Sequence, residues 1–394
     1  MEGHLSRRVL LLLSTCCFSS MATMRVCDAL LPSLASGFHV TLGHAAQAIS
    51  AFAIAYGLMQ LVFGPLGDRF GKVRVISLAT LGCTVGNLGA AISSELGQLL
   101  LARVLSGAAA AAIVPLTMAW IGDKVPYADR QAVLARLLGS TVFGMIAGQW
   151  LGAVVADALS WRMAFALLAF VCVSAGLLLA REDRLNGTAA TSATSNGIGR
   201  RAIGVLSIPW ARTVLIVTFI EGAFAFGSLS FIPSYLHSTF NIPMSKAGAI
   251  VALYGVGGLI YSRFARRLVQ HFGEPNLARL GGLCLALSYG SLALLGTWWL
   301  ALPSCLMAGF GFYALHNTLQ THATQMAPAA RGTAVSLFSC FLFFGQSLGI
   351  LCASRLIDRY SLLPVFVTSA AGLLILALGF SALVARQHTP LVSA

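Results

Sequence analysis

The chain is built from long apolar runs separated by short polar stretches. Most runs extend over about 20 residues or more, the length that an α-helix needs to cross the hydrocarbon core of a bilayer. Twelve such runs follow one another, so the pattern predicts twelve transmembrane helices. Their expected bounds are 9–37, 45–66, 74–93, 97–121, 131–156, 161–180, 211–236, 244–264, 278–296, 299–324, 332–354 and 362–385.

One polar stretch is much longer than the others and lies between the sixth and seventh runs. It is rich in Ser, Thr, Ala and Asn, a composition typical of flexible linkers. We therefore predict an N-terminal six-helix bundle over 1–180, a cytoplasmic linker over 181–210 and a C-terminal six-helix bundle over 211–394. The expected fold class is an all-α membrane protein made of two pseudo-symmetric six-helix bundles.

Composition agrees with a membrane protein. Of the 394 residues, 58% are hydrophobic and 9% are charged, whereas soluble domains carry about 25% charged residues. The 40 glycines suit close packing of membrane helices. Prolines 32, 115 and 233 predict kinks in the first, fourth and seventh helices.

The sequence lacks the common motifs of metal, nucleotide and covalent chemistry. The nine cysteines show no C-x-x-C or Cys/His ligand spacing, so we expect neither a disulfide framework nor a metal site. Walker-type phosphate loops, Rossmann glycine runs and nucleophile elbows are also missing from the sequence. We therefore expect no cofactor, no ATP-driven transport and no enzymatic activity.

The net charge of +13 is explained by membrane topology rather than by nucleic-acid binding. Most of the 25 Lys and Arg residues fall in loops on the side of the N-terminus, which predicts that both termini are cytoplasmic. Arg7 and Arg8 precede the first apolar run as in a secretory signal. The run continues to Phe38, which favours a retained first span.

Three short segments recur in order in the two halves of the chain. The matching pairs are 68–72 with 270–274, 148–152 with 345–349, and 126–130 with 328–331. Such repeats favour duplication of a six-helix unit, with a substrate cavity between the halves near the middle of the membrane.

The segment from Gly64 to Lys72 carries the most specific pattern. It reads Gly-Pro-Leu-Gly-Asp-Arg-Phe-Gly-Lys, the composition of a tight charged turn at a membrane surface. It resembles the signature loop G-x-x-x-D-R-x-G-K/R between the second and third helices of the major facilitator superfamily. The resemblance implies a gating loop on the cytoplasmic side, with Gly64, Asp68, Arg69, Gly71 and Lys72 as its key residues.

The repeat of this loop in the second half is incomplete. Gln270 and His271 stand where the first half has Asp68 and Arg69, although the following Phe-Gly is kept. We therefore predict that the gating loop forms a latch in the first half alone.

Two further motifs resemble those of twelve-helix drug/proton antiporters in this superfamily. The segment from Asp28 to Pro32 matches D-x-x-x-P of helix 1, and the segment from Arg103 to Gly107 matches R-x-x-x-G of helix 4. The resemblance implies that Asp28 binds a proton or a cation and that Arg103 lowers the cost of its charged form. The alternatives are a structural ion pair with Arg25 and an Arg103 side chain that reaches the lipid headgroups.

Further polar residues lie inside the predicted spans. A charge at the centre of a span costs about 2.5–3.5 kcal/mol on insertion scales, so Glu221 in the seventh helix is a candidate proton or substrate site. His316, Asn317 and Gln320 lie within about one turn of the tenth helix and predict a polar cavity wall. Hydrogen bonds that only hold helices together are the alternative.

Gln149 and Gln346 stand at matching places in the repeated Gly-Gln segments of the fifth and eleventh helices. With Arg25 they complete the predicted substrate cavity. The antiporter motif G-x-x-x-G-P-x-x-G-G of helix 5 is matched only in part, because Gln149 replaces its proline. The motif in the fifth helix therefore indicates close helix packing and only weakly indicates the direction of transport.

The resemblance implies proton-coupled efflux of a small organic molecule by alternating access. The expected partners are this substrate, protons and the lipid bilayer, without nucleic acid, for a monomer in the bacterial cytoplasmic membrane. Two alternatives stay open. The first is symport of protons with an organic anion bound by Arg25 and Arg103, and the second is a membrane sensor that does not transport.

Overall fold

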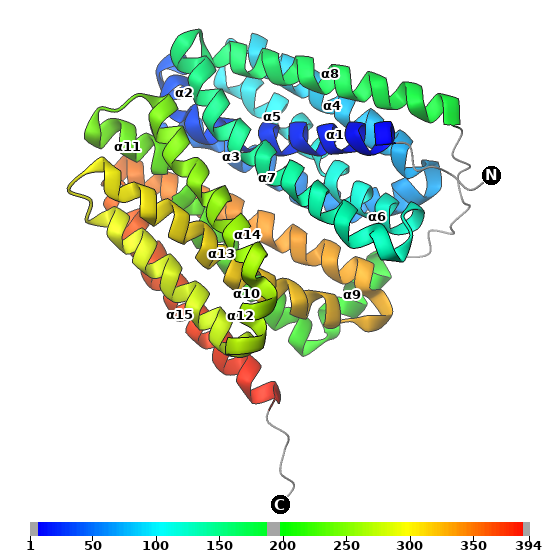
Figure 1. Cartoon of the computed structure of the whole chain (residues 1–394). Coiled ribbons are helices and arrows are strands. Elements are labelled where there is room, and N and C mark those ends of the chain that lie inside the picture. Colours follow the sequence, from blue (N-terminus) through cyan, green and yellow to red (C-terminus); the bar gives the residue numbers. More distant parts are fainter. Residues whose placement is uncertain (1–6, 187–197, 389–394) are drawn as a thin grey trace, which may run out of the picture. The chain divides into compact units, whose positions relative to one another are not determined.

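The computed structural model describes residues 7–186 and 198–388 and consists of helices joined by short connections (Figure 1). Among these residues there is no β-strand, which confirms the all-α prediction. Contacts divide the chain into two units. Unit 1 comprises Met1–Arg200 with Pro243–Ala249, and unit 2 comprises Arg201–Ile242 with Ile250–Ala394.

Unit 1 holds the first eight α-helices and one 3₁₀ turn. They are α1 (Arg7–Arg25), η1 (Val26–Ala29), α2 (Leu31–Phe38), α3 (Leu42–Phe70), α4 (Lys72–Ile92), α5 (Leu96–Ala110), α6 (Ile113–Lys124), α7 (Tyr127–Ala158) and α8 (Trp161–Asn186). Within this unit α1, α4 and α8 run alongside one another (Figure 1).

The second half of the chain begins after α9 (Ile198–Ser207), which leads from one unit to the next. Its elements are α10 (Pro209–Leu229), α11 (Ile232–Phe240), α12 (Met244–Ala293), η2 (Trp298–Leu300), α13 (Ala301–Gln325), η3 (Pro328–Ala330), α14 (Arg331–Arg359) and α15 (Leu363–His388). The predicted linker, 181–210, contains the end of α8 and all of α9, and its residues 187–197 lie outside the described residues.

Eleven helical segments are long and apolar enough to cross a membrane. One of them, α12, has 50 residues. At 1.5 Å per residue a straight helix of that length would span about 75 Å, more than twice the hydrocarbon thickness. The backbone leaves the helical conformation at Gly273, so α12 consists of two limbs. With these two limbs counted separately, residues 7–186 and 198–388 contain twelve spans, as predicted, and the predicted loop between 264 and 278 is mostly helical.

Three spans are interrupted next to a proline, as the sequence predicts. The breaks separate α1 from α2, α5 from α6 and α10 from α11, and Pro32, Pro115 and Pro233 lie in the first turn of the segment after each break. A proline lacks the backbone N–H and disfavours helical conformation in the residue before it. The broken spans are the first and fourth of unit 1 and the first of unit 2.

Glycines bring the first helix of each unit against its fifth. In unit 1, Gly144 and Gly148 of α7 lie against the backbone carbonyls of Phe18 and Ala22 in α1. In unit 2, Gly345 and Gly349 of α14 lie against the carbonyls of Phe219 and Ala223 in α10. Because a side chain would collide with these backbones, small residues are required there. The repeated glycines thus have the same packing role in both units.

Gly345→Ala is expected to destabilise unit 2 by about 1–3 kcal/mol, because the added methyl group would overlap the carbonyl of Phe219 and force the helices apart. Thermal unfolding of the purified protein in detergent measures the effect. Gly290→Ala is the control, since nothing lies within 4 Å of the place its methyl group would take. Equal unfolding midpoints for the two variants would contradict this packing role.

The signature segment is more helical than the sequence suggests. Helix α3 continues through Pro65 to Phe70, and α4 begins at Lys72, so the turn consists of Gly71 alone. Gly71 has φ 90°, and Gly273, at the matching place of the repeat, has φ 70°. Only glycine adopts such backbone angles without strain. The predicted loop from Gly64 is therefore wrong in extent, although the turn and its repeat are present.

Candidate functional site

Asp28 lies where the first span is broken. The 3₁₀ turn η1 places it between α1 and α2, and its side chain is fully buried in unit 1. Arg25 Nη1 donates a hydrogen bond of 3.2 Å to Asp28 Oδ2, and this arginine is also buried. The predicted alternative of an ion pair between neighbours is therefore present in the structure. Removal of one partner from a buried ion pair is costly, because the attraction between the two groups offsets part of their lost solvation.

Gln149 of α7 also contacts this carboxylate. Its Nε2 donates to Asp28 Oδ2 at 3.3 Å, across the close approach of α1 and α7 that Gly148 and Gly152 allow. The other oxygen, Oδ1, has no hydrogen-bond partner among the described residues. One oxygen of Asp28 is thus held by two donors, and the second can accept a proton or a substrate group.

Arg103 is fully buried inside unit 1 and does not reach the lipid headgroups. Its Nη1 donates to the carbonyl of Thr23 at 2.8 Å and its Nε to the carbonyl of Ala48 at 3.3 Å. The guanidinium carbon lies 4.4 Å from the ring centroid of Phe52, within the range of a cation–π contact. No hydrogen bond joins Arg103 to Asp28 in the described part of the chain, so Arg103 influences the carboxylate through space.

Glu221 and His316 form a pair in unit 2. Glu221, on α10, is fully buried, and His316 Nδ1 of α13 lies 2.9 Å from its Oε2. The sequence predicted both residues as candidates but placed no partner beside Glu221. Its second oxygen, Oε1, has no hydrogen-bond partner among the described residues. The arrangement resembles that at Asp28, because one carboxylate oxygen contacts a donor and the other has no hydrogen-bond partner among the described residues.

Aromatic rings enclose the histidine of this pair. The ring of Phe312 stacks on His316 with centroids 4.9 Å apart, and Phe338 of α14 lies at 5.2 Å. Sequence reasoning did not single out either ring for this role. The spacing of Phe312, one helical turn before His316, was the available signal, since residues four apart share a helix face. Nothing in the local sequence indicates Phe338.

The other predicted cavity residues do not gather around Glu221. Asn317 hydrogen-bonds Tyr261 of α12, so its side chain lies on a different face of α13 from His316. Gln320 is exposed. Gln346 is buried, and its side-chain oxygen has no partner among the described residues. The predicted polar wall of His316, Asn317 and Gln320 is therefore divided among different surroundings.

The turn at Gly71 is tied to the end of α6 in unit 1. Lys72 Nζ lies 3.0 Å from Asp68 Oδ1 and 2.7 Å from Asp123 Oδ2. Arg69 points elsewhere, with its guanidinium carbon 5.1 Å from the ring centroid of Phe70. The predicted gating segment thus places Lys72 between two carboxylates, and sequence reasoning missed Asp123.

Unit 2 has a link of its own at the matching turn. Glu274, directly after Gly273, lies with its Oε2 3.1 Å from His322 Nε2 near the end of α13. The rings of Trp210 and Phe380 pack against this histidine. The second half thus has a glutamate and a histidine in contact where the first half holds a lysine between two aspartates. That the first half alone forms a latch stays a prediction.

Comparison with known proteins gives the family. The sequence profile described as Major Facilitator Superfamily matches residues 13–350. The chain belongs to the major facilitator superfamily. Its broken spans, its paired glycine contacts and its two matching turns are thus features of a membrane transporter.

Relatives of this major facilitator protein include named resistance proteins. A chloramphenicol resistance protein of Pseudomonas aeruginosa is 25% identical over 332 residues, covering 81% of this chain and 77% of its own. MdtD of Salmonella typhimurium, whose name proposes multidrug resistance, is 24% identical, with coverage of 86% and 84%. The uncharacterised transporter YceJ of Bacillus subtilis is 24% identical, with coverage of 81% and 82%.

Solved structures show the same fold. A mutant of the nucleoside transporter NupG superposes with a TM-score of 0.80 at 16% identity and covers 95% of this chain and 99% of its own. A D-xylose-proton symporter superposes with a TM-score of 0.74 at 15% identity, with coverage of 95% and 96%. At these identities the likeness concerns the fold of the transporter.

The latch contacts predict unequal effects on the transport cycle. Asp68→Asn should slow cycling about fivefold, because it weakens a network worth about 1 kcal/mol. Glu274→Gln should act similarly through His322, whereas Gln270→Ala should have little effect because Gln270 is exposed. Initial transport rates in proteoliposomes measure this. Equal rates for Asp68→Asn and Gln270→Ala would contradict the role of Asp68.

Proposed function

We propose that this chain exports a small organic molecule in exchange for protons. Asp28 and Glu221 take up and release the protons, and Arg103 lowers the cost of a charged Asp28. The proposal rests on one observation, which is made in both units. A fully buried carboxylate on the first span has one oxygen held by a donor and one oxygen without a partner in the described part of the chain.

Burial makes these carboxylates suitable proton carriers. A carboxylate away from water loses solvation in its charged form, so protonation becomes accessible under physiological conditions. The donors on one oxygen, Arg25 and Gln149 for Asp28 and His316 for Glu221, compensate part of that loss. These donors hold one oxygen in place and leave the other oxygen to take up the proton.

The two sites differ in how their charge is balanced. Asp28 faces an arginine, which stays charged. Glu221 faces a histidine, whose imidazole can hydrogen-bond the carboxyl group without carrying a charge. A proton shared between Glu221 and His316 leaves that pair neutral, whereas a proton on Asp28 changes the net charge of the Arg25–Asp28 pair from zero to positive. Movement of a proton onto Asp28 is therefore the step that changes the electrostatics of unit 1 most.

The direction of transport is proposed from the relatives. Proteins named for chloramphenicol and multidrug resistance are similar to this chain over most of its length. Resistance is a natural result of export. The positive residues favour cytoplasmic termini and, with bacterial relatives, the cytoplasmic membrane of a bacterium. Bundles over 1–180 and 211–394, a monomer, and substrate contacts from Asn317, Gln320 and Gln346 remain predictions.

Proton flux in proteoliposomes tests the proposal. Purified protein is reconstituted with a pH-sensitive dye in the lumen, and candidate compounds such as chloramphenicol are added outside. Exchange predicts that the lumen becomes more alkaline as the compound enters and protons leave. Symport predicts that the lumen becomes more acidic. The sign of the pH change thus separates export by exchange from the alternative of symport with an organic anion.

Matched variants show whether the assigned carboxylates are responsible. Asp28→Asn and Glu221→Gln should each remove the compound-dependent pH change, while Glu95→Gln, at an exposed carboxylate, should leave it intact. Full proton flux in both Asp28→Asn and Glu221→Gln would overturn the assignment. A resistance phenotype that survives both substitutions would favour a protein that acts without proton-coupled transport.

A further inference from the structure

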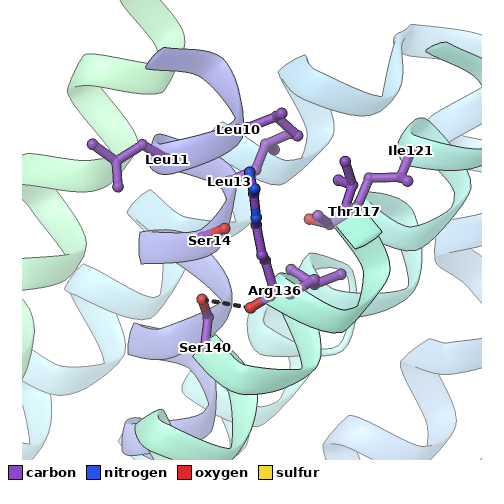
Figure 2. A pocket seen from close by; sticks show the side chains of 10 residues that line it. Leu10, Leu11, Leu13, Ser14, Thr117, Ile121, Arg136 and Ser140 are labelled. Carbon is purple, nitrogen blue, oxygen red and sulfur yellow. Dashed lines mark hydrogen bonds between the residues drawn. The ribbon is translucent and has the colours of Figure 1, made fainter. Parts of the chain in front are cut away.

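A cavity of about 320 Å³ opens in unit 1 where α1 and α7 begin and α6 approaches its end (Figure 2). This volume is at the lower end of the range for small-molecule pockets, about 300–1,000 Å³. Most of the lining is apolar and includes Leu10, Leu13, Ile121 and Leu137. Such a cavity fits a small molecule with an apolar body and is too small to enclose both chains of a phospholipid.

Arg136, an exposed residue, brings a permanent positive charge to the lining of this apolar cavity. Arg136 extends from α7 along the cavity, and its guanidinium lies next to Leu10 and Leu13 of α1 (Figure 2). None of the ion pairs between described residues involves Arg136. The carboxylates of Asp68, Asp123 and Glu182 pair with other cations. An arginine stays charged at physiological pH, so this cavity attracts an anion.

Hydroxyl groups add a second polar feature. Thr117 donates to the carbonyl of Ile113 at 2.7 Å, and Ser140 donates to the carbonyl of Arg136 at 3.2 Å. The hydroxyl of Ser14, on the wall formed by α1, has no hydrogen-bond partner among the described residues. It is therefore the hydroxyl that can donate to a bound anion beside the guanidinium.

We propose that this cavity binds a small organic anion with an apolar body, such as an aromatic carboxylate. The carboxylate contacts the guanidinium of Arg136 and the hydroxyl of Ser14, and the body packs against Leu13 and Leu137. The site lies at the end of unit 1 that carries the Gly71 turn, so it would load substrate from the cytoplasm. That loading role rests on the proposed export, whereas binding itself does not.

Equilibrium binding of 1-naphthoate tests the proposal. The purified full chain is placed in nanodiscs of neutral phosphatidylcholine and titrated with 1-naphthoate, neutral 1-naphthalenemethanol and cationic 1-naphthylmethylammonium. We expect saturable binding of 1-naphthoate alone. Binding should weaken about tenfold or more in Arg136→Gln, which removes the charge, and in Ser14→Leu, which fills the cavity. Arg74→Gln, at an exposed arginine outside the cavity, should bind as the wild type does.

Three results of these titrations would overturn the proposal. They are unchanged 1-naphthoate binding in Arg136→Gln, equal binding of the alcohol or the cation, and the absence of saturable binding to the wild type. Displacement of 1-naphthoate by phosphatidylglycerol in the nanodisc would assign the cavity to a lipid headgroup and would also overturn it.

Binding can be separated from the proposed export. Asp28→Asn and Glu221→Gln should keep the binding of 1-naphthoate, because neither residue lines the cavity. Normal binding without proton-coupled flux would remove the export proposal and leave the cavity assignment standing. Proton-coupled flux without binding of 1-naphthoate would overturn the cavity assignment and leave the export proposal standing.

Discussion

Asp28→Asn is expected to abolish proton-coupled transport and to destabilise unit 1 at the same time. The substitution removes the proton carrier, and loss of one positioned acid–base group lowers rates about 100-fold or more. It also leaves Arg25 charged and buried, 5% exposed at its side chain. Removal of one partner from a buried pair costs about 3–5 kcal/mol. Flux in proteoliposomes and thermal unfolding in detergent measure the two effects.

A double variant separates structure from function at this site. Arg25→Gln combined with Asp28→Asn replaces the ion pair by two neutral amides that can hydrogen-bond to each other. We expect it to recover most of the lost stability, because the buried positive charge is removed together with the negative one. Proton-coupled flux should stay absent. Recovery of flux together with stability would show that the pair is only structural and that the proton moves elsewhere.

Glu221→Gln is expected to stop coupling with little loss of stability. Its partner is His316, 2.9 Å away, which can stay neutral and still hydrogen-bond a glutamine amide. The unfolding free energy should therefore change by no more than about 1 kcal/mol, the net value of one hydrogen bond. Proton-coupled flux should fall about 100-fold, since the glutamine cannot be protonated.

Substitution of His316, the partner of Glu221, should instead lower the stability of the protein. His316→Phe keeps a ring that can stack on Phe312 but removes the donor to Glu221. A buried carboxylate without its donor costs about 1–3 kcal/mol or more, so the protein should lose stability. A Glu221→Gln variant less stable than His316→Phe would contradict this account. Wild-type flux in Glu221→Gln would remove Glu221 from the proton path.

The difference between the two carboxylates has a physical origin in their partners. Arg25 carries a fixed charge, so the site at Asp28 is stable only while both groups are charged or both are replaced. A neutral imidazole at His316 can still hydrogen-bond a neutral side chain, so the site at Glu221 tolerates neutralisation. Two sites with similar burial thus respond differently to the same loss of a negative charge.

Several features were predictable because they depend on neighbours in sequence. The twelve spans follow from the lengths of the apolar runs, and the breaks in three spans follow from Pro32, Pro115 and Pro233. The pairing of Arg25 with Asp28 follows from a separation of three residues. The turn at Gly71 and its copy at Gly273 follow from the repeat, because both places require a backbone that glycine adopts readily.

Other features depend on contacts between distant segments, and sequence reasoning missed or misplaced them. Glu221 and His316 are 95 residues apart and meet because α10 and α13 pack together. The contact between Glu274 and His322 joins the turn at Gly273 to the end of α13, and no short motif predicted it. Arg103 was expected near the headgroups as an alternative, yet its bonds to the carbonyls of Thr23 and Ala48 hold it inside unit 1.

The sequence by itself determined the number of membrane spans, the family and the identities of the buried charged residues. These depend on hydrophobicity and on short motifs, which act over a few neighbouring residues. Only the tertiary structure decided the partners of those charges and the cavity beside Arg136. Pairing and cavities arise where helices distant in sequence approach, and small residues such as Gly148 and Gly345 control how closely they do so.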